Sequence, residues 1–249
     1  MPVGEATRAA ARYGPAMKLS KLLPATLLLT ACAVDAAPDE PEATATDEAA
    51  LSATPQLTAI PTFKAVMTTT NGLSVMKPTG TVSGDFLLAF AEYDATPMQL
   101  TPPAGWTLVA DQLSGSGTPQ VMHAVVFSHR AGASEPDEFM FNAPSGVFVD
   151  LQVASYTGVT AVDGHSGEGV RTGTILAPDL VTVAANELLV SLFVDFEFGS
   201  WSTSAGMTQR TNFDANSIQD VRIPLAGHTE KHLASCTFGQ QAAVNVTLR

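Results

Sequence analysis

Residues 84–93 read GDFLLAFAEY, and this stretch decides the fold class. It is rich in phenylalanine and leucine, which favour a pleated, half-buried strand. In an extended chain Phe86, Leu88 and Phe90 lie on the same face, because successive side chains alternate between faces. We therefore expect a β-strand with one buried face here.

Three further stretches have the same character: QVMHAVVFSHR (120–130), VFVDLQVASY (147–156) and ELLVSLFVDFEF (187–198). In the last of them one face carries Val190, Leu192, Val194, Phe196 and Phe198. Clusters rich in glycine, proline and serine separate the stretches: residues 95–105, 114–120, 132–138, 142–146 and 163–169. No convincing amphipathic helix occurs from residue 59 onward. The pattern predicts an all-β fold, either an antiparallel β-sandwich or a jelly roll.

A weak internal repeat suggests that the fold has two similar halves. Residues 85–109 align with residues 187–211 when one residue is dropped. Asp85 then matches Glu187, Leu87 matches Leu189, and PAGWT at Gly105 matches SAGMT at Gly206. Each copy reads as a strand, a loop and a glycine-centred turn that lets Trp106 or Met207 close one end of a sandwich. We expect a pseudo-symmetric pair of sheets in one domain.

The combination GDFLLAF, TPPAGWTLV, HRAGASEPDEFMF and YTGV resembles a β-sandwich module of bacterial surface proteins and phage tail fibres. The resemblance covers nearly all of residues 59–249. Its motifs are turns and a core tryptophan, so it implies a fold and, more loosely, a role in attachment or recognition. It implies no catalytic residues.

The sequence MKLSKLLPATLLLTAC (17–32) resembles a bacterial lipoprotein signal peptide. Lys18 and Lys21 form its basic region, and the apolar run that follows is far shorter than the roughly 20 residues of a membrane span. Its end, Leu29 to Cys32, resembles a lipobox, which implies cleavage before Cys32 and acylation of that cysteine. We expect residues 1–31 to be the signal peptide, with Met17 as the true start.

Residues 32–58 are expected to be a disordered, lipid-anchored linker. The segment holds six acidic residues and no lysine or arginine, with prolines at 38, 41 and 55. Such a linker holds the domain, residues 59–249, away from the membrane. By the enteric sorting rule, Ala33 after the cysteine implies export to the outer membrane. The periplasmic face and the external face of that membrane both remain open alternatives. The second cysteine, Cys236, is expected to be unpaired.

The charge balance narrows the possible partners. The chain has 12 basic and 24 acidic residues, a formal net charge of -12. This argues against nucleic acid and anionic membrane surfaces, which attract basic proteins. The expected contact with membrane is the lipid anchor alone, and carbohydrate or another envelope protein is the candidate partner.

Most patterns that suggest catalysis fail on inspection. GHSGE (164–168) lacks the second glycine of a nucleophile elbow around Ser166, and we interpret it as a turn. HTEKH places His228 and His232 four residues apart, which forms a zinc pair only on a helix. His123 and His129 are expected in the core or at strand ends. We expect no metal and no cofactor.

Asp195 and Glu197 form the one acidic pair of interest. They lie two residues apart on the strand face opposite Phe196 and Phe198, about 7 Å from each other. Trp201 follows in a loop, where it is either an exposed platform for a sugar ring beside the two carboxylates or a cap on the sandwich end. These three residues are the candidate ligand site.

Three functions remain open. The preferred one is a non-catalytic recognition or adhesion module on a lipid-anchored bacterial envelope protein, with glycan as one candidate ligand. The second is a carbohydrate-active hydrolase using Asp195 and Glu197. The third is a structural envelope lipoprotein without a ligand. One fold serves all three, so only a site can separate them.

Overall fold

The computed structural model describes residues 59–94, 99–115, 122–170, 174–196, 199–236 and 239–249. All of them belong to the second of the two units into which the chain divides, Met1–Thr54 and Pro55–Arg249. The predicted signal peptide, Cys32 and the linker to residue 58 lie outside these ranges. Within them the chain forms sixteen strands and no helix. No helix that could cross a membrane was therefore found in this part of the chain.

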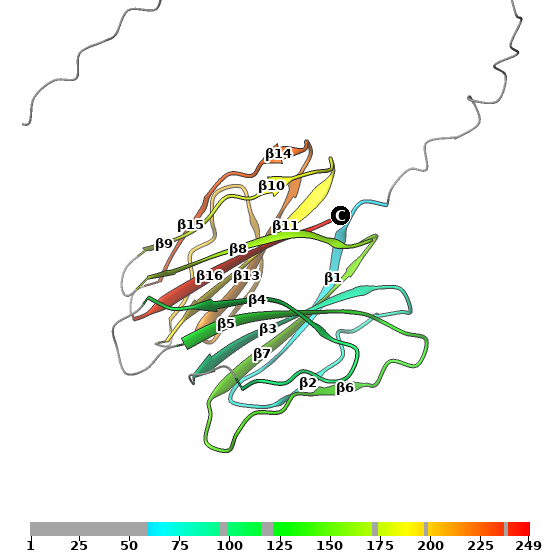
Figure 1. Cartoon of the computed structure of the whole chain (residues 1–249), viewed down its shortest axis with the longest axis vertical. Coiled ribbons are helices and arrows are strands. Elements are labelled where there is room, and N and C mark those ends of the chain that lie inside the picture. The colour runs from blue at the N-terminus through cyan, green and yellow to red at the C-terminus, as the bar shows by residue number, and fades with distance from the viewer. Residues whose placement is uncertain (1–58, 95–98, 116–121, 171–173, 197–198, 237–238) are drawn as a thin grey trace, which may run out of the picture. The chain divides into compact units, whose positions relative to one another are not determined.

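Ten strands form two five-stranded antiparallel sheets, stacked as two layers in Figure 1. The first sheet has the order β1 (Thr62–Thr69), β7 (Val149–Thr157), β3 (Phe86–Asp94), β5 (Met122–Arg130), β4 (Thr107–Leu113). The second has the order β12 (Thr208–Phe213), β13 (Asn216–Ile223), β11 (Glu187–Asp195), β16 (Gln241–Leu248), β8 (Val162–Val170). The four strands expected from the sequence are β3, β5, β7 and β11.

Six short strands pair outside the two sheets. The pairs are β2 (Ser74–Met76) with β6 (Glu138–Met140), β9 (Thr174–Ala177) with β15 (His232–Ser235), and β10 (Val181–Thr182) with β14 (Gly227–His228). In Figure 1 the β2–β6 pair lies below the first sheet, and the β9–β15 pair lies above the second.

The fold is a β-sandwich, and its main core lies between the two sheets. Phe86, Leu88 and Phe90 of β3 face this core, as their alternation predicts, and they pack with Val190 and Leu192 of β11. All five are at least 93% buried. Burying each such side chain contributes roughly 1.5–3 kcal/mol, so the interface between the sheets is the main source of stability.

The predicted duplication is present in the topology. Read from the matching edge, the two sheets are β1-β7-β3-β5-β4 and β8-β16-β11-β13-β12, and the strands occupy the same order along the chain in both halves. The β2–β6 and β9–β15 pairs also arise at matching points of the two halves. Each half of the chain therefore builds one sheet and one matching short pair beside it, and the second half also forms the β10–β14 pair.

The duplication extends to the turn after the repeat's long loop. Gly105 and Gly206 both have a left-handed backbone, with φ of 87° and 79°. This conformation costs glycine little and other residues more. Trp106 and Met207 follow them and are 9% and 8% exposed. Each donates its backbone N–H to the carbonyl three residues earlier, and each is buried as the sequence predicts.

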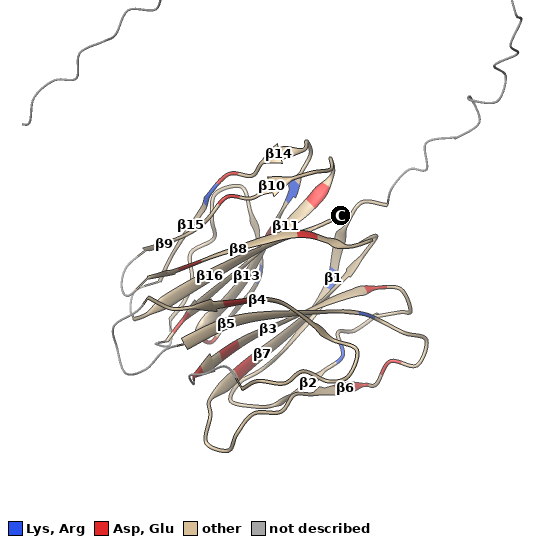
Figure 2. Cartoon of the chain, viewed as in Figure 1, with Lys and Arg blue, Asp and Glu red and all other residues tan. Residues whose placement is uncertain are grey.

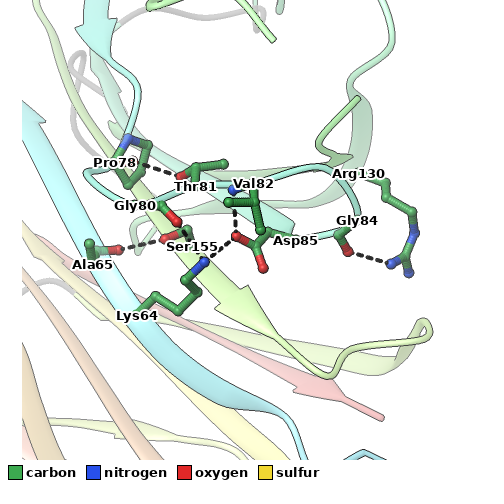
Figure 3. Close-up of polar contacts among 10 residues, drawn as sticks. All are labelled: Lys64, Ala65, Pro78, Gly80, Thr81, Val82, Gly84, Asp85, Arg130 and Ser155. Atoms are coloured by element: carbon green, nitrogen blue, oxygen red, sulfur yellow. Dashed lines mark hydrogen bonds and ion pairs between the residues drawn. The ribbon is translucent and has the colours of Figure 1, made fainter. Parts of the chain in front are cut away.

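A second matched feature precedes β3 and β11. The carboxylate of Asp85 accepts a hydrogen bond from the backbone N–H of Val82 at 2.8 Å, and Glu187 accepts one from Ala184 at 2.9 Å. Each acid thus closes a turn of four residues. Figure 3 shows that Lys64 reaches the same Asp85 carboxylate from β1, at 2.5 Å. The aligned acids Asp85 and Glu187 therefore have a structural role.

The expectation of a turn at residues 163–169 is wrong, because these residues lie in the edge strand β8. The glycines serve close packing against the β4 end of the first sheet. A Cβ atom on Gly169 would lie 2.1 Å from the carbonyl oxygen of Leu113, and one on Gly167 would lie 2.5 Å from Oε1 of Gln112. Ser166 donates to the carbonyl of Pro178 at 3.1 Å, a structural contact.

Candidate functional site

The candidate site predicted around Trp201 is not exposed. Trp201 is 3% exposed, its indole packs against Phe193 with ring centres 5.6 Å apart, and its Nε1 donates to the carbonyl of Ala215 at 2.8 Å. The platform hypothesis is therefore wrong. The alternative of a cap on the sandwich end is not confirmed either, because Trp201 packs on the outer face of the second sheet, beside Phe193 and Ala243. The cause of its burial is the β9–β15 pair, whose Ile175, Ala177 and Ala234 cover Trp201.

Asp195 is also buried rather than on a solvated face. It is fully shielded from solvent and accepts a hydrogen bond from Nε2 of Gln241 at 3.0 Å. It does lie on the face of β11 opposite Val194, as alternation predicts. Glu197, its expected partner, lies outside the described residues, whereas Phe196 packs against the main core. The described members of the predicted site, Asp195 and Trp201, are thus not open to a ligand.

His123 and His129 make contacts within the first sheet and its turns, whereas His228 and His232 lie on two different short strands. Nδ1 of His123 lies 2.7 Å from Asp111, and His129 stacks on Trp106 while its ring nitrogens lie 2.9 Å from the Gly105 carbonyl and 3.0 Å from Glu135. His228 on β14 pairs with Asp179, whereas His232 on β15 is buried, which lowers its pKa. Among the described residues no group of three or more histidine, cysteine or acidic side chains is arranged to hold a metal.

A different acidic pair lies on the inner face of the first sheet. Glu92 continues the alternation of Phe86, Leu88 and Phe90, and so it points between the sheets. In the β3–β7 ladder its direct partner is Asp150. The side chains of such cross-strand partners have Cβ atoms about 4.5–5.5 Å apart. Glu92 is 5% exposed and Asp150 is 2% exposed, so two carboxyl groups share one buried place.

Only part of the hydrogen-bonding capacity of this pair is used. Asn216 of β13 donates its side-chain amide to Glu92 at 2.9 Å, and the backbone N–H of Asn71 donates to Oδ1 of Asp150 at 2.7 Å. The second carboxylate oxygen of Asp150 and the carbonyl oxygen of the Asn216 side chain are buried without a partner. Unsatisfied buried polar atoms are rare in proteins, and they point to a missing ligand or water.

The two acids open into a pocket of 260 Å³. Its walls are formed by Glu92, Asp94, Phe148, Asp150, Phe196 and Ala215. In Figure 2 acidic segments of β3 and β7 lie side by side at one end of the first sheet. Among the described residues, the lining contains three carboxyl groups and two half-buried phenylalanines, and no lysine, arginine or histidine. We call this the acidic pocket.

Burial and mutual repulsion keep protons on the acidic pocket. The pKa of Glu92 is raised well above its ordinary value, first by burial and then by the charges of Asp150, Asp195 and Asp214, although the bond from Asn216 opposes this. Burial likewise raises the pKa of Asp150 to about 6, against the bond from Asn71. Asp150 therefore gains a negative charge above about pH 6 in a place that disfavours it, and a cation bound beside it would offset that cost.

Part of this site could have been found in the sequence. Glu92 occupies a core-facing position in the same alternation that identifies β3, and an acid at such a position is unusual. Asp150 alternates in the same way with Ala154 and Tyr156 on β7. Their pairing depends on the register between two strands far apart in the chain, which no local pattern indicates.

A second pocket of 330 Å³ lies beside β13, β14 and β15. Arg222 and Glu230 both line it, together with His228, His232 and the exposed Leu225. Its charges are mixed and most of its side chains are solvated. The acidic pocket is the better candidate for a specific binding site, because Glu92 and Asp150 are buried and lie directly opposite each other in the β3–β7 ladder.

Comparison of the chain with known protein families, curated proteins and solved structures gave no significant match.

Proposed function

We propose that this chain is a lipid-anchored bacterial envelope protein whose β-sandwich is a non-catalytic recognition module, with the acidic pocket as its binding site. The observation that carries the binding site is the unpartnered carboxylate oxygen of Asp150 beside Glu92. A buried carboxyl without a full set of partners costs stability. A ligand that satisfies it would recover that cost.

The location of the pocket supports presentation to a partner. Thr62, the first residue of β1, pairs with Thr157 at one end of β7, and the linker joins the domain near this point. Asp150 lies at the other end of β7, about 23 Å away at about 3.3 Å per residue. A domain tethered through residues 32–58 would thus hold its pocket at the end remote from the tether.

A carbohydrate-active hydrolase is the second candidate, with Glu92 and Asp150 in place of Asp195 and Glu197. Two facing carboxyl groups resemble the acid and the nucleophile of a retaining glycosidase, which lie about 5–5.5 Å apart, but here the pKa of both is raised, whereas a nucleophile has to be ionised. The pocket volume of 260 Å³ favours recognition instead. A hydrolase must hold sugar units on both sides of the scissile bond, whereas this pocket suits one small group.

The anchor is tested by the intact mass of the protein from the membrane fraction of a bacterial host. We expect a mass that begins at Cys32 and carries two or three acyl chains, and a Cys32→Ser variant that leaves the membrane fraction. A full-length, unmodified protein in the soluble fraction would overturn this part of the proposal.

Binding is tested with the lipidated chain in detergent on an array of bacterial envelope glycans and envelope-protein peptides. Binding that Asp150→Asn abolishes and Glu168→Gln retains is the expected result, since Glu168 is an exposed acid on β8. No binding to any spot would favour the structural lipoprotein. Release of reducing sugar that Glu92→Gln abolishes would favour the hydrolase.

A further inference from the structure

The acidic pocket combines features that select one class of ligand. It offers buried carboxyl groups at its base and phenylalanine side chains in its walls. Carboxylates attract a cation, and aromatic rings attract both cations and apolar carbon. A neutral sugar could donate its hydroxyls to the carboxyl groups but would leave their charge unneutralised, and an anion would be repelled by them.

We infer that the acidic pocket binds the alkylammonium group of a ligand, with the ammonium at Glu92 and Asp150 and the alkyl arm against Phe148 and Phe196. This inference rests on the proposed function and names the ligand class of the same site. A protein-borne lysine side chain and a free alkylamine share this chemistry.

The unpartnered atoms match the donors of an ammonium group. An ammonium has three N–H donors and no acceptor. Near the Glu92–Asp150 pair, the second oxygen of Asp150 and the side-chain oxygen of Asn216 lack partners in the structure, and both residues are 2% exposed. Asn216 comes from the second sheet and reaches the pair by its bond to Glu92, and the pocket lining takes Phe196 and Ala215 from the same half of the chain.

A hard metal ion fits this pocket less well. Calcium takes six to eight oxygen ligands, and magnesium keeps several waters in an octahedral shell. No group of three acids in the described residues has the arrangement to hold a metal. The two phenylalanines also occupy parts of the pocket wall where a metal site would need oxygen ligands. An alkylammonium needs fewer acceptors and gains from an apolar wall.

The charges around the pocket make binding depend on pH. The charged groups that act on Glu92 are Asp150, its partner on β7, Asp195 on β11 and Asp214 in the β12–β13 turn, and all of them are acidic. Asp94 adds a further carboxyl to the lining. Below its raised pKa of about 6, Asp150 carries a proton that competes with the ammonium. Affinity is therefore expected to rise about tenfold between pH 5 and pH 7.5, mainly through Asp150.

The test uses calorimetry on the lipidated full chain in detergent. The probes are Nα-acetyl-lysine N-methylamide, its neutral analogue Nα-acetyl-norleucine N-methylamide, and n-pentylamine. We expect the lysine probe to bind at least tenfold more tightly than the norleucine probe, with the pH dependence given above. Pentylamine as tight as the lysine probe would assign recognition to the amine alone, and weaker pentylamine would assign it to a peptide-borne lysine.

Neutral substitutions of the two pocket acids, with one control acid on β8, test the contribution of each carboxyl group to binding. Asp150→Asn and Glu92→Gln preserve shape and the acceptor oxygens for Asn71 and Asn216, and each is expected to weaken the lysine probe at least tenfold. Glu168→Gln removes the same charge from β8 and is expected to leave affinity within twofold. Equal affinity for the lysine and norleucine probes, or calcium binding that excludes the amine, would overturn the inference.

Different results would reject the recognition module and its alkylammonium ligand. Array binding that needs Asp150, without binding of either amine, would reject the alkylammonium ligand and retain the recognition module. Absence of array binding and of amine binding would reject both.

Discussion

Trp201 and Asp195 donate hydrogen bonds to the same atom, the carbonyl oxygen of Ala215. The indole Nε1 of Trp201 lies 2.8 Å from it, and the backbone nitrogen of Asp195 lies 3.0 Å from it. The acceptor belongs to the turn between β12 and β13. The two residues therefore meet as the sequence led us to expect, but in the packing of the sandwich rather than in a binding site.

Trp201→Phe is expected to lower the free energy of unfolding by about 1 kcal/mol, because it removes the indole donor and retains an aromatic ring. Trp201→Ala is expected to cost about 3–5 kcal/mol through the cavity beside Phe193. Urea denaturation of both variants measures this. Two small, equal effects would contradict a core role for Trp201.

Asp150→Asn is expected to stabilise the protein without ligand at pH 7. The pKa of Asp150 rises from 3.8 to about 6 on folding, so the folded state holds its proton more tightly than the unfolded state does. The resulting stability is full below pH 3.8 and is lost as the pH rises through about 6. The asparagine side chain does not ionise, so the variant does not lose stability in this way as the pH rises.

Urea midpoints of wild type and Asp150→Asn between pH 4 and pH 7.5 test this behaviour. The advantage of the variant should grow across that range and exceed about 1 kcal/mol at its upper end. Glu168→Gln is the control, and its difference from wild type should be small. An advantage of Asp150→Asn that shrinks as the pH rises would contradict the assigned sign.

Gly169→Ala is expected to destabilise the sandwich by about 1–3 kcal/mol, because the new Cβ would lie 2.1 Å from the Leu113 carbonyl and the sheets would have to shift. Gly164→Ala on the same strand is the matched control. Its Cβ would meet nothing closer than Thr247 Oγ1 at 3.7 Å. Thermal unfolding of the two variants compares them, and equal losses would show that close packing of β8 is unimportant.

Arg210→Ala is expected to cost about 3–5 kcal/mol. Arg210 of β12 forms two 2.8 Å hydrogen bonds with Asp220, which is 2% exposed, and its guanidinium lies 4.6 Å from the centre of the Phe63 ring of β1. Its removal leaves a buried carboxylate and loosens one side of the sandwich. Urea denaturation should show this loss.

Lys77→Ala provides the comparison for Arg210→Ala. Lys77 pairs with Asp137, whose side chain is 89% exposed, so its removal should cost less than about 1 kcal/mol. If the two substitutions cost the same, the Arg210 pair would not be acting as a buried contact.

Local alternation was enough to predict four of the long strands, β3, β5, β7 and β11, and the core face of β3 and β11. The glycine-centred turns at Gly105 and Gly206 could also be predicted from the sequence, because a left-handed backbone strongly favours glycine. The repeat between residues 85–109 and 187–211 also predicted the duplicated topology, because similar local sequences form the same succession of strand, loop and turn in each half.

The sequence by itself thus determined the β-sandwich, its two similar halves and the inward face of each central strand. Only the tertiary structure decided that the β9–β15 pair covers Trp201, that residues 162–170 form an edge strand, and that Glu92 faces Asp150. Strand register and the covering of an outer face arise from contacts between distant segments. A period of two along one strand carries no information about which distant segment lies opposite.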